Sequence, residues 1–157
     1  MRVNSVFVVA VFAALSVSGV TAAAAKPPKK LFSVCSNGPK GTGAKYHIKN
    51  VRPTEGQTMT FTVKFKPKET ITSGHVFLGY SVGPTLLETP YTMCEATNQE
   101  KGCTLPAGEE ATAVVKYTIP EDPDDTIVFK IYGHVNDKDI WCFEGEVPVK
   151  KKKKSSK

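Results

Sequence analysis

The feature that most constrains this chain is a repeated alternation of apolar and polar residues, which is the period of a β-strand. Across 57–65, four apolar side chains alternate with four polar ones, so that the apolar ones share one face of a strand. The alternation recurs further along the chain, and an earlier strand is expected over 46–51. The further segments are 75–82, 111–119, 126–131 and 143–149.

Proline, glycine and acidic residues separate these segments. They gather at 52–56, 83–84, 105–108, 120–123 and 136–137. No segment combines a long apolar period of 3.6 residues with a cap at each end. The sequence therefore predicts an all-β fold, an immunoglobulin-like two-sheet antiparallel β-sandwich of about seven strands.

The two ends of the chain differ in composition from its body. Arg2, an uncharged apolar run over 6–20 and four small residues over 22–25 form the pattern of a secretory signal peptide, which we expect to be 1–25. A retained membrane anchor is the alternative, but the run is short for one. We expect a single domain over 26–149, followed by a disordered lysine-rich tail over 150–157. The destination is then secreted, or an endolysosomal or vacuolar lumen.

The formal net charge of +6 comes largely from the tail, which holds six of the 21 basic residues. The predicted domain is close to neutral. Nucleic-acid binding usually needs basic residues clustered on a folded face, often with stacking aromatics. We therefore expect no nucleic-acid partner.

Four cysteines, Cys35, Cys94, Cys103 and Cys142, follow the leader. An even number in an exported chain predicts two disulfides, and three pairings are formally possible. The polar stretch from Cys94 to Cys103 favours a local bridge, which would leave Cys35 to join Cys142. A zinc site is the alternative, but it lacks the close cysteine spacing and a nearby histidine pair.

Motifs of catalysis do not occur in this sequence. There is no Gly-x-Ser-x-Gly elbow or His-Glu-x-x-His pair, and His47, His75 and His134 fall within predicted strands. The acidic run over 121–125 lacks the alternate spacing of a calcium-binding loop and indicates a solvated turn. We expect no enzyme activity, no metal and no cofactor.

Three motifs occur in a recognisable order in the second half. Gly-Tyr-Ser-Val-Gly-Pro ends a strand at Pro84, Cys103 precedes Leu-Pro-Ala-Gly, and Trp-Cys-Phe-Glu-Gly opens the last strand. This order resembles the ML (lipid-recognition) domain family, over 33–149. The family includes the Niemann-Pick type C cholesterol carrier, phosphatidylglycerol/phosphatidylinositol transfer proteins and group 2 mite allergens. The family joins its first cysteine to its last and closes its middle loop, which agrees with the spacing. Many sterol-binding members carry a further disulfide where 39–44 has no cysteine, so the resemblance does not separate sterol from phospholipid.

The resemblance implies that the two sheets hold a lipid in an internal apolar cavity. The expected walls are Phe61, Val63, Phe65, Val76, Leu78, Tyr80, Tyr117, Phe129 and Ile131. The mouth is expected between an 82–90 loop and the 120–123 turn, at Leu86, Leu87, Pro120 and Pro123. For each wall residue the alternative is ordinary core burial.

The resemblance implies a monomeric protein that binds a sterol or phospholipid and shuttles it between membranes. Its tail would contact an anionic membrane surface through Lys150, Lys151, Lys152, Lys153 and Lys154, although a merely solvated tail is the alternative. A competing interpretation is an immunoglobulin-like secreted recognition module with a solid core and no lipid.

Overall fold

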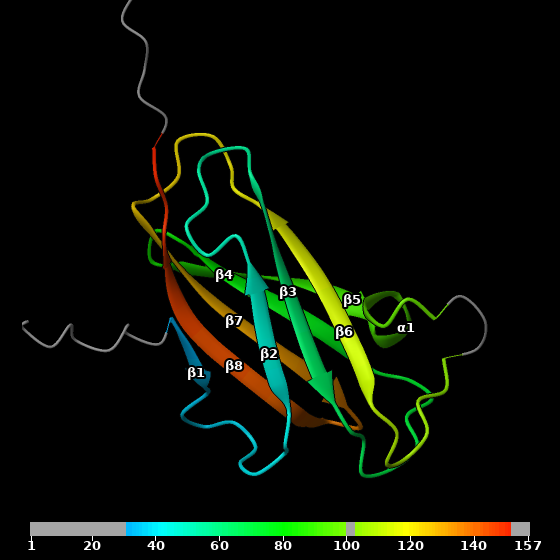
Figure 1. The fold of residues 1–157 in the computed structure, drawn as a ribbon. Helices are drawn as coiled ribbons and strands as arrows, with labels where there is room; N and C mark the ends of the chain where they lie inside the picture. Colours follow the sequence, from blue (N-terminus) through cyan, green and yellow to red (C-terminus); the bar gives the residue numbers. More distant parts are fainter. Residues whose placement is uncertain (1–30, 100–102, 152–157) are drawn as a thin grey trace, which may run out of the picture.

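The computed structural model describes residues 31–99 and 103–151, so the predicted signal peptide over 1–25 lies outside the described residues. The described chain forms eight strands and one short helix, arranged as in Figure 1. The elements are β1 (Phe32–Val34), β2 (Lys45–Lys49), β3 (Thr58–Phe65), β4 (His75–Val82), β5 (Thr85–Thr92), α1 (Met93–Ala96), β6 (Ala111–Thr118), β7 (Thr126–Val135) and β8 (Lys138–Pro148).

The strands form two sheets that lie face to face (Figure 1). One sheet has five strands in the order β1-β8-β7-β4-β5, and the other has three in the order β2-β3-β6. All neighbouring strands are antiparallel. The predicted all-β sandwich is confirmed, with eight strands in place of about seven.

Strand β5 replaces the loop that the sequence predicted over 82–90, and that prediction is wrong. Strands β4 and β5 pair in register from His75 opposite Thr92 to Val82 opposite Thr85, so only Gly83 and Pro84 turn the chain. Gly83 has a φ of 56°, which glycine adopts without strain. Since β5 is an edge strand and largely exposed, no alternation of buried residues marked it in the sequence.

The other strands follow the predicted alternation. In β3, Met59, Phe61, Val63 and Phe65 are buried, and the residues between them are not. Strands β4, β6, β7 and β8 bury their inward side chains against the same core. Apolar burial of this kind is the main favourable term for a domain of this size, at roughly 25 cal/mol per Å².

A two-residue turn joins β7 to β8. Asn136 and Asp137 both have positive φ, of 49° and 59°. This is the conformation of the hairpin turns whose twist matches that of the strands, and Asn and Asp tolerate it better than other side chains. The hairpin places Trp141 opposite Gly133, next to a register shift between Gly133 and His134.

Both predicted disulfides are confirmed. Cys35 is bonded to Cys142 with their Cα atoms 5.4 Å apart, which ties the end of β1 to β8. Cys94 is bonded to Cys103 with their Cα atoms 5.1 Å apart, which ties α1 to the segment before β6. The first bridge thus closes a long loop and the second a short one.

Helix α1 is short but well capped. The Thr92 hydroxyl accepts a hydrogen bond from the Glu95 amide, and the Glu95 carboxylate accepts one from the Thr92 amide. These bonds to Thr92 lower the pKa of Glu95. No helix among the described residues is both long and apolar enough to cross a membrane.

Candidate functional site

The predicted wall residues lie on the inner faces of both sheets. Their positions follow from the alternation, because every second residue of a strand faces the opposite sheet. All but Tyr80 and Tyr117 are fully buried, and those two are half-buried. The small sheet supplies Phe61, Val63, Phe65 and Tyr117, and the large sheet supplies Val76, Leu78, Tyr80, Phe129 and Ile131.

Aromatic rings meet at the centre of the space between the sheets. The ring centroids of Phe61 and Phe129 are 5.1 Å apart, and those of Phe129 and Tyr117 are 5.2 Å apart. No polar or charged residue of the described segments is fully buried. The interior therefore offers an apolar environment and no charged partner for a bound molecule.

Three tyrosines lie at the edge of the sandwich where β5 and β6 approach each other. The Tyr80 and Tyr117 rings lie 4.6 Å apart, and the Tyr91 hydroxyl donates a 3.2 Å hydrogen bond to the Lys116 carbonyl oxygen. Burial, followed by the nearby Tyr80 hydroxyl, raises the pKa of both Tyr91 and Tyr117. Both phenols are therefore neutral at physiological pH.

The segments of the predicted mouth lie together at one end of the sandwich. The Gly83 amide donates a 3.1 Å hydrogen bond to Asp124 Oδ2, which joins the β4–β5 turn to the acidic turn. Pro120 is exposed, whereas Pro123 is buried. The predicted mouth segments are therefore neighbours in space.

The two predicted gate leucines are exposed, Leu86 by 47% and Leu87 by 43%, but they lie on opposite faces of β5. Leu87 is opposite Tyr80 and shares the inner face, whereas Leu86 is opposite Ser81 on the outer face. A Cβ built on Gly79, in the outer row, would lie 3.6 Å from Leu86 Cδ1. Only Leu87 is therefore placed to face the space between the sheets.

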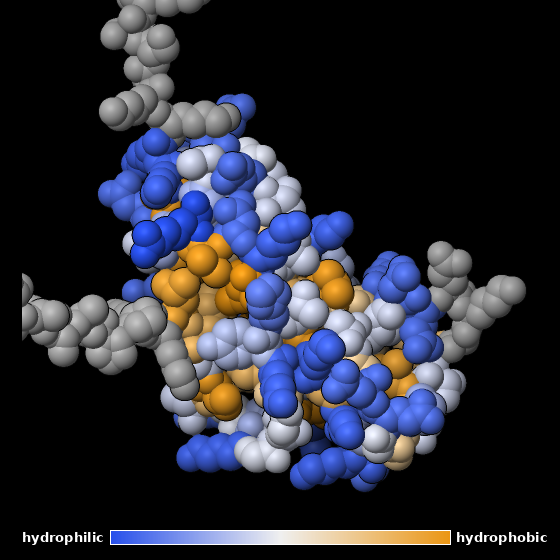
Figure 2. All heavy atoms as spheres, viewed as in Figure 1, coloured by the Kyte–Doolittle hydropathy of each residue, from blue (hydrophilic) through white to orange (hydrophobic). Residues whose placement is uncertain are grey.

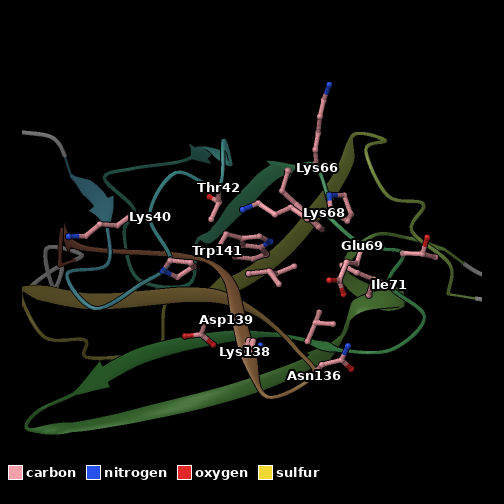
Figure 3. Close-up of a pocket in the computed structure, with 16 residues that line it drawn as sticks. Lys40, Thr42, Lys66, Lys68, Glu69, Ile71, Asn136, Lys138, Asp139 and Trp141 are labelled. Carbon is pink, nitrogen blue, oxygen red and sulfur yellow. The ribbon is translucent and has the colours of Figure 1, made fainter.

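The opposite end of the sandwich contains a hollow of about 470 Å³, shown in Figure 3. Its wall is formed by the buried apolar side chains of Phe65, Ile71 and Trp141. Its rim carries the exposed lysines Lys40, Lys66, Lys68 and Lys138. We refer to these seven residues and the space between them as the lysine-rimmed hollow.

Of the residues that line this hollow, only Phe65 was predicted from the sequence as a site residue. Its residues come from the β1–β2 and β3–β4 connections and the β7–β8 hairpin, which meet only in the folded chain. One signal was present, because the aromatic Trp141 beside a disulfide cysteine indicates a buried ring. The lysines resembled ordinary solvated residues.

The start of the tail lies at the end of the sandwich that holds the predicted mouth. The Lys150 amide donates a hydrogen bond to the Pro53 carbonyl oxygen, and Lys151 Nζ lies 3.3 Å from Asp125 Oδ1. Lys152, Lys153 and Lys154 lie outside the described residues. Lys151 therefore lies beside the acidic turn.

Apolar residues also reach the surface of the sandwich. Figure 2 shows a band of hydrophobic residues between β8 and the small sheet, with hydrophilic residues around it. Within 31–99 and 103–151, no three His, Cys, Asp or Glu side chains are grouped so that they could hold a metal ion.

A family model, that of the ML domain, matches residues 31–149. The chain belongs to the ML domain family. A crystal structure of a Niemann-Pick type C2 protein from the Japanese carpenter ant is similar in fold, with a TM-score of 0.52 and 12% identity, and the match covers 68% of this chain and 89% of that one. Chicken MD-1 complexed with lipid IVa aligns with a TM-score of 0.49 and 13% identity, over 74% of this chain and 86% of that one. No curated protein matches the sequence.

Proposed function

We propose that this ML-domain protein binds a sterol or phospholipid between its two sheets and carries it between membranes. The observation that carries the proposal is the family match over 31–149, which spans both sheets. The uncharged interior supports it, because an apolar guest needs a dry surface and no charged partner. No catalytic step is part of this function.

A lipid that reaches the centre has to separate the aromatic rings that meet there. Each aromatic pair contributes roughly 0.5–1.5 kcal/mol beyond its area burial. Burying a methylene group contributes about 0.8 kcal/mol, so an alkyl chain of about ten carbons gains roughly 8 kcal/mol. Transfer of the chain therefore outweighs the loss of the Phe61–Phe129 and Phe129–Tyr117 contacts.

Delivery would occur at the end where Leu87, Pro120 and Pro123 lie. The tail begins there, and a lysine near an anionic membrane contributes about 1 kcal/mol. The two disulfides support an oxidising compartment, either outside the cell or in an endolysosomal or vacuolar lumen. In this proposal the protein acts as a monomer, and Lys150–Lys154 orient it at the membrane.

The first experiment fills the space between the sheets. Ala113 is buried on the inner face of β6, and its neighbour Val114 is exposed on the outer face. A113F places a ring inside the sandwich, whereas V114F places the same ring outside as the matched control. Both proteins, and the wild type, are purified from the native host, extracted with organic solvent and analysed by mass spectrometry for sterols and phospholipids.

We expect lipid with the wild type and V114F, and a loss of at least tenfold with A113F, while circular dichroism shows that A113F remains folded. Equal lipid content in A113F and V114F would place the lipid elsewhere. No lipid in any of the three, together with no binding of fluorescent sterol and fatty-acid probes, would favour the recognition module with a solid core.

The second experiment tests the tail. Truncation after Lys151 keeps the contacts of Lys150 and Lys151 with the domain and removes the remaining four lysines. Transfer of a fluorescent lipid between anionic vesicles is expected to slow, and binding of the lipid to remain unchanged. High salt should slow the wild type in the same way. An unchanged transfer rate would refute the role of the tail.

A further inference from the structure

The lysine-rimmed hollow lies at the end of the sandwich away from the predicted mouth. It combines an apolar wall with a cationic rim, and about 470 Å³ is within the range of small-molecule sites. Glu69 and Asp139 also line it, but Asp139 Oδ1 lies 2.9 Å from His134 Nδ1 and is engaged there. The rim therefore carries four lysines and one remaining carboxylate, that of Glu69.

Trp141 has a buried donor with no partner. The residue is 1% exposed, and its indole Nε1 makes no hydrogen bond to any described residue. A buried donor left unpaired costs free energy, and native structures rarely contain one without a reason. Gly133 lies directly under the ring, since a Cβ built there would be 2.8 Å from Nε1. An oxygen acceptor in the hollow would satisfy this N–H group.

Lys68 is the cation placed nearest to such an acceptor. In Figure 3 its side chain extends across the hollow over Trp141, whereas the side chains of Lys40 and Lys66 point away from it. Lys68 is exposed, so it can reach a ligand without first being desolvated. A negatively charged oxygen between the two would accept one hydrogen bond from the ammonium group and one from the indole N–H, and both are charge-assisted because the acceptor is ionised.

We propose that the lysine-rimmed hollow binds the oxyanion head group, carboxylate or phosphate, of a single-chain amphiphile. Lys68 and Trp141 Nε1 donate to the head group. The chain lies on Phe65 and Ile71, which lead from the hollow into the core shared by both sheets. The inference rests on the proposed lipid binding and adds to it the chemical class of one ligand and its orientation.

The test compares three probes by calorimetry at neutral pH: dodecanoic acid, its methyl ester and inorganic phosphate. The acid carries a charged carboxylate at neutral pH, whereas the ester has the same alkyl chain and a neutral head group that is one methyl group larger. Inorganic phosphate carries the charge without a chain. We expect the acid to bind at least tenfold more tightly than the ester or phosphate, because only the acid uses both the rim and the apolar wall.

Variants separate the head-group contact from general charge. K68Q should weaken binding of the acid about tenfold and leave the ester unchanged, and K68R should restore it. K64Q is the matched control, because Lys64 is an exposed lysine of β3 outside the hollow, 3.4 Å from Glu110. W141F keeps an aromatic wall and removes the N–H group. It should weaken the binding of the acid more than the binding of the ester.

The two proposals fail in different ways. Equal affinity for acid and ester, or equal effects of K68Q and K64Q, would overturn the head-group site while lipid binding stands. Phosphate as tight as the acid would overturn the role of the apolar wall. If neither acid nor ester binds and the purified protein carries no lipid, the proposed function itself fails.

Discussion

Replacing Phe129 with alanine tests whether the centre of the sandwich is only a packed core or also a lipid-binding space. Phe129 is 0% exposed, and its ring contacts Phe61 from the opposite sheet and Tyr117 from β6. The truncation removes the ring at the point where the two inner faces meet. Its neighbour Val128 is 42% exposed on the outer face and gives the matched control V128A.

The magnitude follows from burial. A buried phenylalanine truncated to alanine costs about 3–5 kcal/mol, the sum of lost transfer free energy and the cavity left behind. The exposed V128A should change stability by less than about 0.5 kcal/mol. A lipid that binds only the folded state at a hundredfold excess over its Kd adds about 2.7 kcal/mol. In F129A the same lipid should add more, because its chain occupies the space that the ring leaves.

Urea unfolding of the wild type, F129A and V128A, each delipidated and lipid-loaded, measures the six free energies of unfolding by Trp141 fluorescence. We expect bound lipid to raise the free energy of unfolding more in F129A than in V128A. This expectation would be refuted if lipid raised the stability of both variants equally, since the guest would then not share space with the Phe129 ring. If the free energy of unfolding of delipidated F129A fell by less than about 1 kcal/mol, the reasoning would also be refuted, since the ring would then not be packed between the sheets.

Three further predictions concern the two disulfides, the glycine beside Trp141 and the Tyr132 hydroxyl group. Replacing Cys35 and Cys142 by serine should lower the free energy of unfolding by about 4.8 kcal/mol, because their disulfide closes a loop of 107 residues. Replacing Cys94 and Cys103 by serine should lower it by about 2.6 kcal/mol, because their loop spans 9 residues. Urea unfolding of the two double variants measures the difference, and equal losses would contradict the prediction. A Cβ on Gly133 would lie 2.7 Å from Trp141 Cε2, so G133A should destabilise the protein by about 1–3 kcal/mol. It should also shift the fluorescence of Trp141, the single tryptophan of the chain. An unchanged spectrum and an unchanged stability would show that the ring moves freely. Burial, followed by the 3.1 Å hydrogen bond to Glu88, raises the pKa of Tyr132 to about 12. The contribution of neutral Tyr132 to stability is therefore complete below pH 10 and is lost as the pH rises toward 12. A phenolate titration of the wild type, Y132F and E88Q should show that the pKa of Tyr132 falls toward 10 in E88Q, and an unaltered titration would rule out the Glu88 contact.

Sequence reasoning succeeded where a local rule governs the structure. The alternation in β3 fixes which side chains are buried, because adjacent residues of a strand must face opposite sides. The disulfide pairing followed from the lack of a strand pattern between Cys94 and Cys103, which left Cys35 for Cys142. The family resemblance is confirmed over 31–149.

It failed where burial depends on distant segments. Strand β5 buries few side chains, so its residues carry no alternation, and pairing with β4 alone defines it. The lysine-rimmed hollow depends on three connections that meet in space, and no rule of spacing brings Lys68 over Trp141. The placement of Leu86 on the outer face could have been predicted from alternation, had the segment been recognised as a strand.

The central ring contact lies between the lysine-rimmed hollow and the end of the sandwich that holds the predicted mouth. Along β3, Phe65 lines the hollow, Phe61 contacts Phe129, and Met59 lies toward the other end. A short amphiphile held by Lys68 can stay within the hollow and leave the rings in contact, whereas a long one has to part them. F129A should therefore raise the affinity for hexadecanoic acid and leave the affinity for octanoic acid unchanged, because only the longer chain occupies the space of the ring. Calorimetry of the two acids measures this, and an equal effect on both would mean that the hollow and the centre are one continuous site.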